Sequence, residues 1–398
     1  MEYKEDEEYN FVQTQLIGNT QSWPWFGIPS GVYLVNPGMS IWVFTVLAKL
    51  FGIHHPTHLA TAVQIFAWLG IALIIPFALR WVKDQTERNL WLWACTLAMV
   101  NPFLVLYQRK LWPEPFLPMF VMLTWMGWWN RHRVWGALLW GLVGASLGQI
   151  HMSGFFFALA LFLWTLQWKR KHTQWLAWVA GSTLGALPLI PWAIYILHHP
   201  VNHAITAGWS EIVQLKFWAF FLTDPTGFHL GNPLGILRGP SHWDQLSDFV
   251  RYPLIRGSAT YITGLAHLGT LILMVWIFAR GLRSLWRNRR HFRDYLVGGN
   301  SNTLFVQNAT FILCGVLMTA TGVMIRRFYM AITFPLEFIL LVRMARPQTP
   351  RGRNLLLALW IMELAVSANF VGYVHTNHGS ITGDYGVGYQ AQGRETPH

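Results

Sequence analysis

Apolar segments of about twenty residues recur along this chain, and they constrain its fold more than any other feature. A helix of that length crosses a hydrocarbon core of about 30 Å, and the backbone groups of any spanning segment must be satisfied internally. The short alternating segments of a barrel do not dominate here. Apolar residues make up 53% of the sequence and charged residues only 12%, against about 25% charged residues in soluble chains. The sequence therefore predicts an all-α fold, a polytopic transmembrane helical bundle.

Ten stretches are predicted to cross the membrane: 57–80, 89–106, 115–130, 134–149, 152–168, 174–197, 259–280, 303–325, 329–345 and 354–374. An eleventh, 37–53, is shorter and carries Lys49, which favours a helix lying at the interface. The chain is thus one integral membrane domain, 1–398. Its predicted parts are a first outer loop with an acidic motif and the interfacial helix (1–56), six spans (57–197), a long outer loop (198–258), four spans (259–374) and an outer C-terminal tail (375–398).

The distribution of basic residues predicts the orientation. If 1–56 lie outside, the short inside segments hold 18 of the 29 Lys and Arg residues, as cytoplasmic loops commonly do. The net charge of +12 then reflects topology, and it does not indicate a nucleic-acid partner. We expect an inner (cytoplasmic) membrane protein of the prokaryotic type.

Charged residues on the predicted outer face are the candidates for a site. The stretch MEYKEDEEYNF contains four consecutive carboxylates, Glu5 to Glu8, and two basic pairs, Arg109-Lys110 and Arg326-Arg327, end spans on the same side. Guanidinium and ammonium groups suit an anion such as phosphate. The alternatives are a solvated acidic terminus and basic residues that extend to lipid headgroups.

Several other outer residues allow two interpretations. Glu114, between two prolines, either caps a helix or belongs to a site. Tyr107 and Tyr329 either offer a hydroxyl to a phosphate or sugar, or anchor the chain at the interface. Gln149 and His151 face outward as well, although a lone histidine is more often structural. No cofactor is predicted, and no spacing of His, Cys or Asp resembles a metal site.

A set of short motifs resembles the GT-C class of polytopic membrane glycosyltransferases. The branch is the one that contains protein O-mannosyltransferases and the lipid A aminoarabinose transferase. In this sequence Asp6-Glu7, Asn36-Pro37 and the tripeptide LFG at 50–52 stand where that branch has an acidic pair, a Pro-containing turn and a helix end. The stretches RKLWPEPFLPMFVML, RRFYMAITFPLEFIL and GDYGVGYQAQ are similar to its later landmarks.

The resemblance implies an enzyme that moves a sugar from a polyprenyl-phosphate donor to an acceptor hydroxyl of a glycan, lipid or protein at the outer face of the membrane. It implies Asp6 as the catalytic base with Glu7 beside it, and the chemistry is that of inverting sugar transfer. Candidate substrate-binding residues are Glu7, Arg109, Lys110, Glu114, Arg326, Arg327 and Tyr329. We expect this activity to serve glycosylation in the cell envelope.

One departure from the family pattern keeps other functions open. A first transmembrane helix normally precedes the acidic loop, whereas this sequence starts in the loop, so we expect that helix to be missing. A catalytically inactive relative that binds the lipid is one alternative. A polytopic transporter is another, although its ionisable residues should lie near the midplane in repeated halves. No such repeat is visible.

Overall fold

The computed structural model of the protein describes residues 3, 5–29, 34–199, 214–227, 243–287, 295–299, 301–322 and 325–377. Nearly all of its regular structure is helical, as the sequence predicts. The first half contains α1 (Glu5–Leu16), β1 (Phe26–Pro29), β2 (Val35–Pro37), α2 (Met39–Phe51), α3 (Pro56–Ala72), α4 (Ile74–Trp81), α5 (Gln85–Ala98), α6 (Pro102–Tyr107), α7 (Leu117–Trp129), α8 (Val134–Ile150), α9 (Ser153–Trp168), α10 (Trp175–Ala186) and α11 (Ile190–His198).

The second half is more often interrupted. It contains α13 (Lys216–Thr223), α14 (Trp243–Arg251), β3 (Leu254–Ile255), β4 (Ser258–Ala259), α15 (Ile262–Arg287), α17 (Asn302–Asn308), a π-helical turn (Ala309–Cys314), α18 (Gly315–Ala320), a 3-10 helix (Arg327–Thr333), α19 (Leu336–Ala345) and α20 (Pro350–Thr376). Each of the two strand pairs, β1–β2 and β3–β4, is a small antiparallel hairpin.

Five described helical segments are long and apolar enough to span a membrane: Pro56–Trp81, Trp175–His198, Ile262–Arg287, Asn302–Ala320 and Pro350–Thr376. They match five of the ten predicted spans closely. The chain is therefore a membrane protein of several spans. The 3-10 helix Arg327–Thr333 and α19 meet at an angle of 79°. They give a sixth candidate span only if this bent pair is treated as one continuous segment.

The other predicted spans correspond to shorter helices, and their crossing of the membrane stays a prediction. The stretch 89–106 divides into α5 and α6 at Asn101, whose side chain accepts hydrogen bonds from the backbone N–H groups of Phe103 and Leu104 and so caps α6. The stretches 115–130, 134–149 and 152–168 form α7, α8 and α9, of 13, 17 and 16 residues. The predicted interfacial helix is α2, of 13 residues.

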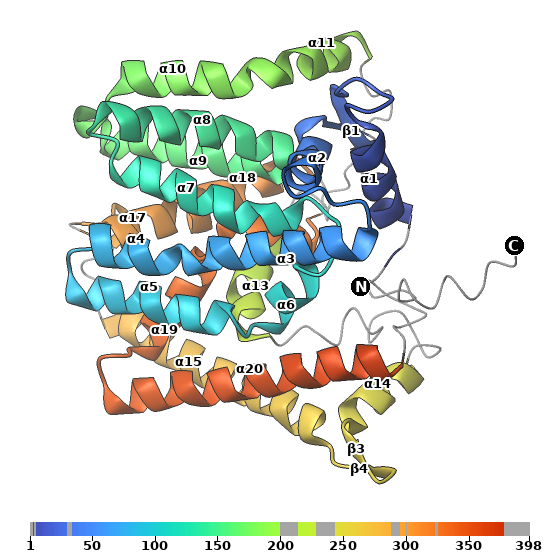
Figure 1. Ribbon diagram of the computed structural model, residues 1–398. Helices are drawn as coiled ribbons and strands as arrows, with labels where there is room; N and C mark the ends of the chain where they lie inside the picture. Colours follow the sequence, from blue (N-terminus) through green and yellow to red (C-terminus); the bar gives the residue numbers. More distant parts are fainter. Residues whose placement is uncertain are drawn as a thin grey trace, which may run out of the picture.

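The helices lie roughly side by side, and the molecule has two different ends (Figure 1). The turns α4–α5, α9–α10 and α19–α20, which carry basic residues of the predicted inside loops, gather at the left-hand end of the view. Helices α1 and α14 and both hairpins lie at the other end. These three basic turns therefore share one end of the molecule, in agreement with the predicted orientation.

Part of the predicted outer loop 198–258 lies within the bundle. Helix α13 buries Phe217 and Phe221 completely and contacts α18 and α19. The indole N–H of Trp218 donates a hydrogen bond to the carbonyl of Phe311 at 2.8 Å. Residues 200–213 and 228–242 lie outside the described residues, as does the predicted tail from 378 onward.

Helix α10 packs on α8 through small residues. Gly181 and Gly185 are buried on α10, and a Cβ atom at either position would collide with the backbone carbonyls of Leu138 or Leu142 on α8. Most of the α10–α11 surface is otherwise exposed. Lipid tails are as apolar as the side chains of a spanning helix, so burial of apolar surface does not drive two such helices together. Their association in lipid depends instead on close backbone contact of this kind.

We predict that Gly181→Leu loosens the α8–α10 contact and lowers the unfolding temperature of the detergent-solubilised protein, since overpacking a close contact costs about 1–3 kcal/mol. The control is Ala180→Leu, which adds a similar volume on the exposed face of the same helix. Equal unfolding temperatures for the two variants would show that the contact does not hold α10 in place.

Candidate functional site

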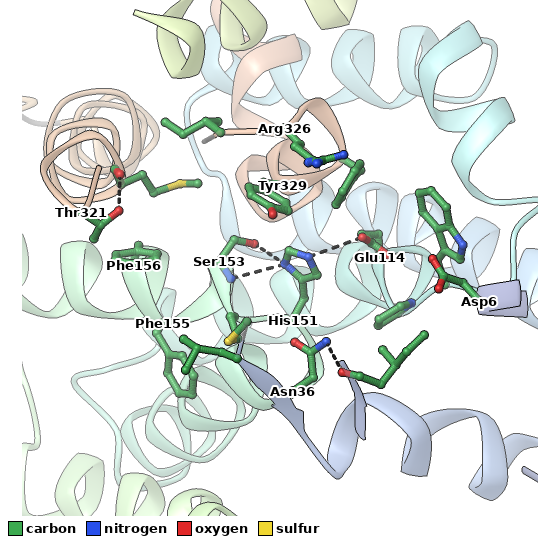
Figure 2. Close-up of a pocket in the computed structure, with 18 of the residues that line it drawn as sticks. Asp6, Asn36, Glu114, His151, Ser153, Phe155, Phe156, Thr321, Arg326 and Tyr329 are labelled. Carbon is green, nitrogen blue, oxygen red and sulfur yellow. Dashed lines mark hydrogen bonds and ion pairs between the residues drawn. The ribbon is translucent and has the colours of Figure 1, made fainter. Parts of the chain in front are cut away.

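The structure contains a cavity of about 580 Å³ (Figure 2). Two of the elements that line it, α1 and the β1–β2 hairpin, lie at the end of the molecule opposite the basic turns (Figure 1). The walls of the cavity come from α1, the β1–β2 hairpin, the turn at 112–114, the α8–α9 turn, α11 and the segment from 318 to 329. Segments far apart in the sequence thus meet around one space. It contains four of the predicted site residues: Asp6, Glu114, Arg326 and Tyr329.

Helix α1 is fixed to this end of the bundle by its polar face. Glu7, Asn10 and Thr14 recur at helical spacing and are almost completely buried. The carboxylate of Glu7 lies 3.9 Å from the Nζ atom of Lys110, which is also buried, and the amide of Asn10 donates to the carbonyl of Leu111 at 2.8 Å. Lys110 in turn lies 4.0 Å above the ring of Trp112. These contacts connect α1 to the turn that carries Glu114.

The four acidic residues at the start of the chain occupy different environments. Asp6 is exposed and lines the cavity, whereas Glu7 is buried against Lys110. Glu8 is exposed, and it does not belong to the cavity wall. The side chain of Glu5 lies outside the described residues. Helical geometry therefore separates side chains that are adjacent in sequence.

Glu114, His151 and Ser153 form a connected group in the cavity wall (Figure 2). The Nε2 atom of His151 lies 3.4 Å from Oε1 of Glu114. Its Nδ1 atom lies 2.6 Å from the Ser153 hydroxyl and accepts the backbone N–H of Ser153 at 3.3 Å. Because Nδ1 is the acceptor, the proton of the neutral ring is assigned to Nε2, which faces the carboxyl group. The other carboxyl oxygen of Glu114 is buried without a hydrogen-bond partner in the described part of the protein.

Burial controls the charge of this group. It raises the pKa of Glu114 from 4.5 to about 8, with Asp6 and Glu7 acting in the same direction and Lys110 in the opposite one. Burial also lowers the pKa of His151 from 6.5 to about 4. At neutral pH Glu114 is therefore a carboxylic acid and His151 a neutral imidazole. Asp6, in contrast, is an exposed carboxylate of the same wall.

The two basic pairs are each divided by the structure. Arg326 lines the cavity, whereas the Nε atom of Arg327 lies 3.1 Å from the carboxylate of Asp224. Burial raises the pKa of Asp224 to about 7, although Arg327 acts against that shift. Lys110 faces Glu7, and Arg109 is not part of the cavity wall. Of the four predicted cations, Arg326 is the one that this cavity contains.

Aromatic side chains form much of the remaining wall. Tyr329 lies with its ring centroid 5.2 Å from that of His151. Further aromatic residues of the wall are Trp112, Phe155, Phe156, Trp192 and Phe328. No pattern in the sequence indicates which of its many aromatic residues meet here. It also favoured a structural role for His151, because a single histidine in a turn has no distinguishing spacing.

Two further predicted candidates lie outside the cavity wall. The amide of Gln149 donates to the carbonyls of Ala145 and Gly185, which is a structural contact between α8 and α10. Tyr107 is buried in a second apolar cluster. Among the described residues, no group of three or more His, Cys, Asp or Glu side chains is arranged to hold a metal ion.

None of the protein-family models, curated proteins and solved structures compared with this chain matches it. A functional assignment therefore depends on the residues of the cavity and on the motifs of the sequence.

The raised pKa of Glu114 predicts a pH dependence of stability. In the unfolded chain the carboxyl group ionises near its ordinary pKa of 4.5, whereas the folded protein keeps it protonated up to about 8. The folded state then binds more protons between these values, so the contribution of Glu114 to stability is complete below pH 4.5 and is lost as the pH rises toward 8. We expect Glu114→Gln to reduce the fall in unfolding temperature between pH 5 and 8.5.

The matched control is Glu8→Gln, an exposed carboxylate two residues from Asp6, which should leave that fall unchanged. Thermal unfolding in detergent at several pH values measures both variants. An unchanged pH dependence in Glu114→Gln would contradict the assignment.

Proposed function

We propose that this protein is a membrane glycosyltransferase with a GT-C-like fold, which moves a sugar from a polyprenyl-phosphate donor to an acceptor hydroxyl. The observation that carries the proposal is that one exposed carboxylate, Asp6, and one guanidinium, Arg326, both line the same 580 Å³ cavity. Such a cavity offers a base for the acceptor and a cation for the leaving phosphate. The order of the sequence motifs that resemble this class is the second support.

The reaction that we propose is a single displacement. Asp6 takes the proton of the acceptor hydroxyl while the oxygen of that hydroxyl forms a bond with the anomeric carbon of the sugar. The bond between this carbon and the phosphate oxygen breaks, and the lipid phosphate leaves with the electron pair. Attack from the opposite face inverts the configuration at the anomeric carbon. Arg326 stabilises the negative charge that develops on the phosphate.

The rest of the wall suits such a donor. Aromatic faces at Trp112, Phe155 and Trp192 fit the apolar face of a sugar ring or the first isoprene units. Glu114 is uncharged at neutral pH, so it adds no repulsion to a phosphate. In this proposal Glu7 and Lys110 act as positioning residues, because their contact holds the helix that carries Asp6.

We further propose that the cavity faces the extracytoplasmic side of an inner membrane. The basic turns gather at the opposite end of the molecule, and basic loops generally stay in the cytoplasm. Acceptors on that side of the membrane include the glycans, lipids and proteins of the cell envelope.

The first test is Asp6→Asn. We expect transfer to fall by about 10²–10⁴-fold, which is the usual contribution of a general base, while binding of undecaprenyl phosphate is retained. Release of undecaprenyl phosphate from a panel of its hexose and pentose esters, in the presence of envelope extract, measures the reaction. The matched control is Glu8→Gln, which alters a neighbouring carboxylate outside the cavity wall. Equal activity of Asp6→Asn and the wild type would contradict the role of Asp6.

The second test is Arg326→Gln. Loss of the cation should lower kcat by about 10²-fold, as expected for a group that stabilises charge in the transition state, and should weaken the binding of undecaprenyl phosphate. Arg326→Lys keeps the charge without the planar fork, so it should recover part of the binding. If Arg326→Gln binds the lipid phosphate as tightly as the wild type, the phosphate is held elsewhere.

The same measurements distinguish the enzyme from a catalytically inactive relative. A wild-type protein that binds undecaprenyl phosphate through Arg326 but releases none of it from any ester would support a lipid-binding function. The cavity would then serve recognition without transfer.

A further inference from the structure

Five arginine side chains line a second cavity, of about 410 Å³, at the basic end of the molecule. Three of them lie on the last turns of α15, and the other two come from the turn between α19 and α20 and from the start of α20 (Figure 1). They are Arg280, Arg283, Arg287, Arg346 and Arg351. The remaining wall consists of Trp276, Ala279 and Ser284, so no carboxylate belongs to the described lining.

The spacing of these residues brings like charges together. Arg280, Arg283 and Arg287 are three and four positions apart, so they share one face of α15, where like charges repel. The N-terminus of α20, which begins at Pro350, adds a positive dipole end beside them. An anion in this cavity would offset both effects.

The hydrogen bonds of the cluster leave its charge uncompensated. Arg280 donates to the hydroxyl of Thr349 at 2.9 Å, and Arg346 donates to the hydroxyl of Ser284. Both acceptors are neutral. Within the described part of the chain, Arg283, Arg287 and Arg351 make no hydrogen bond or ion pair with another residue. Several guanidinium groups can therefore turn toward a ligand.

An exposed apolar strip continues from the arginine cluster along the spanning helix. Trp276, 57% exposed, lines the cavity one turn before Arg280. Ile272, Leu268 and Leu265 follow at helical spacing and are exposed by 57%, 52% and 63%. Helix α15 is a candidate span. We expect this exposed apolar strip to face hydrocarbon and the arginines at the end of the helix to lie at headgroup depth.

We propose that this cavity binds an anionic phospholipid that carries two phosphate groups, of the cardiolipin type. A phosphodiester has one negative charge, so a headgroup with two phosphates matches five guanidinium groups better than a headgroup with one. Arg forms paired hydrogen bonds with phosphate oxygens, and basic pockets between spans on the cytoplasmic side are typical places for such headgroups. The exposed strip then accommodates an acyl chain, which a soluble phosphate does not have.

This site lies at the other end of the molecule from the cavity that contains Asp6 and Arg326. Its occupation does not depend on the proposed transfer reaction. Helices α15 and α20 contact each other extensively. A lipid held between the end of α15 and the start of α20 would add a further link between these two helices.

The test uses the double variant Arg283→Gln/Arg287→Gln. Native mass spectrometry of the full-length protein with cardiolipin, phosphatidylglycerol and phosphatidylethanolamine measures lipid binding. We expect roughly thirtyfold weaker binding of cardiolipin to the variant, since each of the two direct arginine–phosphate hydrogen bonds that are lost contributes about a fivefold gain. The wild type should prefer cardiolipin over phosphatidylglycerol and should show no preference for phosphatidylethanolamine.

The matched control is Arg170→Gln/Lys171→Gln, which removes two charges from exposed residues at the same end of the molecule, outside this cavity. Its cardiolipin binding should stay within about twofold of the wild type, a difference well below that for a lost specific contact. An equal loss in both variants would overturn the site, as would unchanged binding in Arg283→Gln/Arg287→Gln. Equally tight binding of pyrophosphate, with the same loss in the variant, would overturn the lipid as the occupant.

Discussion

In a hydrocarbon environment each backbone N–H and C=O group needs a hydrogen-bond partner within the protein, and the whole structure depends on this constraint. Long helices meet it without help, and they form the body of the bundle. Irregular backbone at membrane depth is tolerated only where protein surrounds it or where it lines a cavity. The described non-helical segments at 110–113 and 325–326 agree with this rule, because both contribute to the wall of the 580 Å³ cavity. The departures from helix and the candidate site therefore coincide.

Charge divides the molecule into two ends with different chemistry. At one end the basic turns gather, and five arginines meet without a carboxylate among the described lining residues. At the other end a few charged groups are separated by burial. Glu7 and Lys110 face each other away from the cavity, as do Arg327 and Asp224, whereas Asp6 and Arg326 both line it.

Much of the fold follows from the sequence. Five predicted spans correspond to described helices, and most of their ends agree to within a few residues. The reason is that a long apolar segment has few other conformations in lipid. The breaks were harder to predict, although their signals are present. Asn101 and Pro102 begin a new helix inside one predicted span, and Pro335 lies where the 3-10 helix meets α19. Proline marks such a break, but only the packing of neighbouring helices determines whether a helix bends or ends there.

The sequence by itself determined the helical membrane class, the gathering of basic loops at one end, and the set of charged residues from which a site could be built. Only the tertiary structure decided which of them meet. Asp6, Glu114, His151 and Arg326 come from four separate segments, and adjacent residues such as Asp6 and Glu7 point into different environments. The physical reason is that a side chain's direction depends on the rotation of its helix. That rotation is fixed by distant contacts, here those of Glu7 with Lys110 and of Asn10 with Leu111.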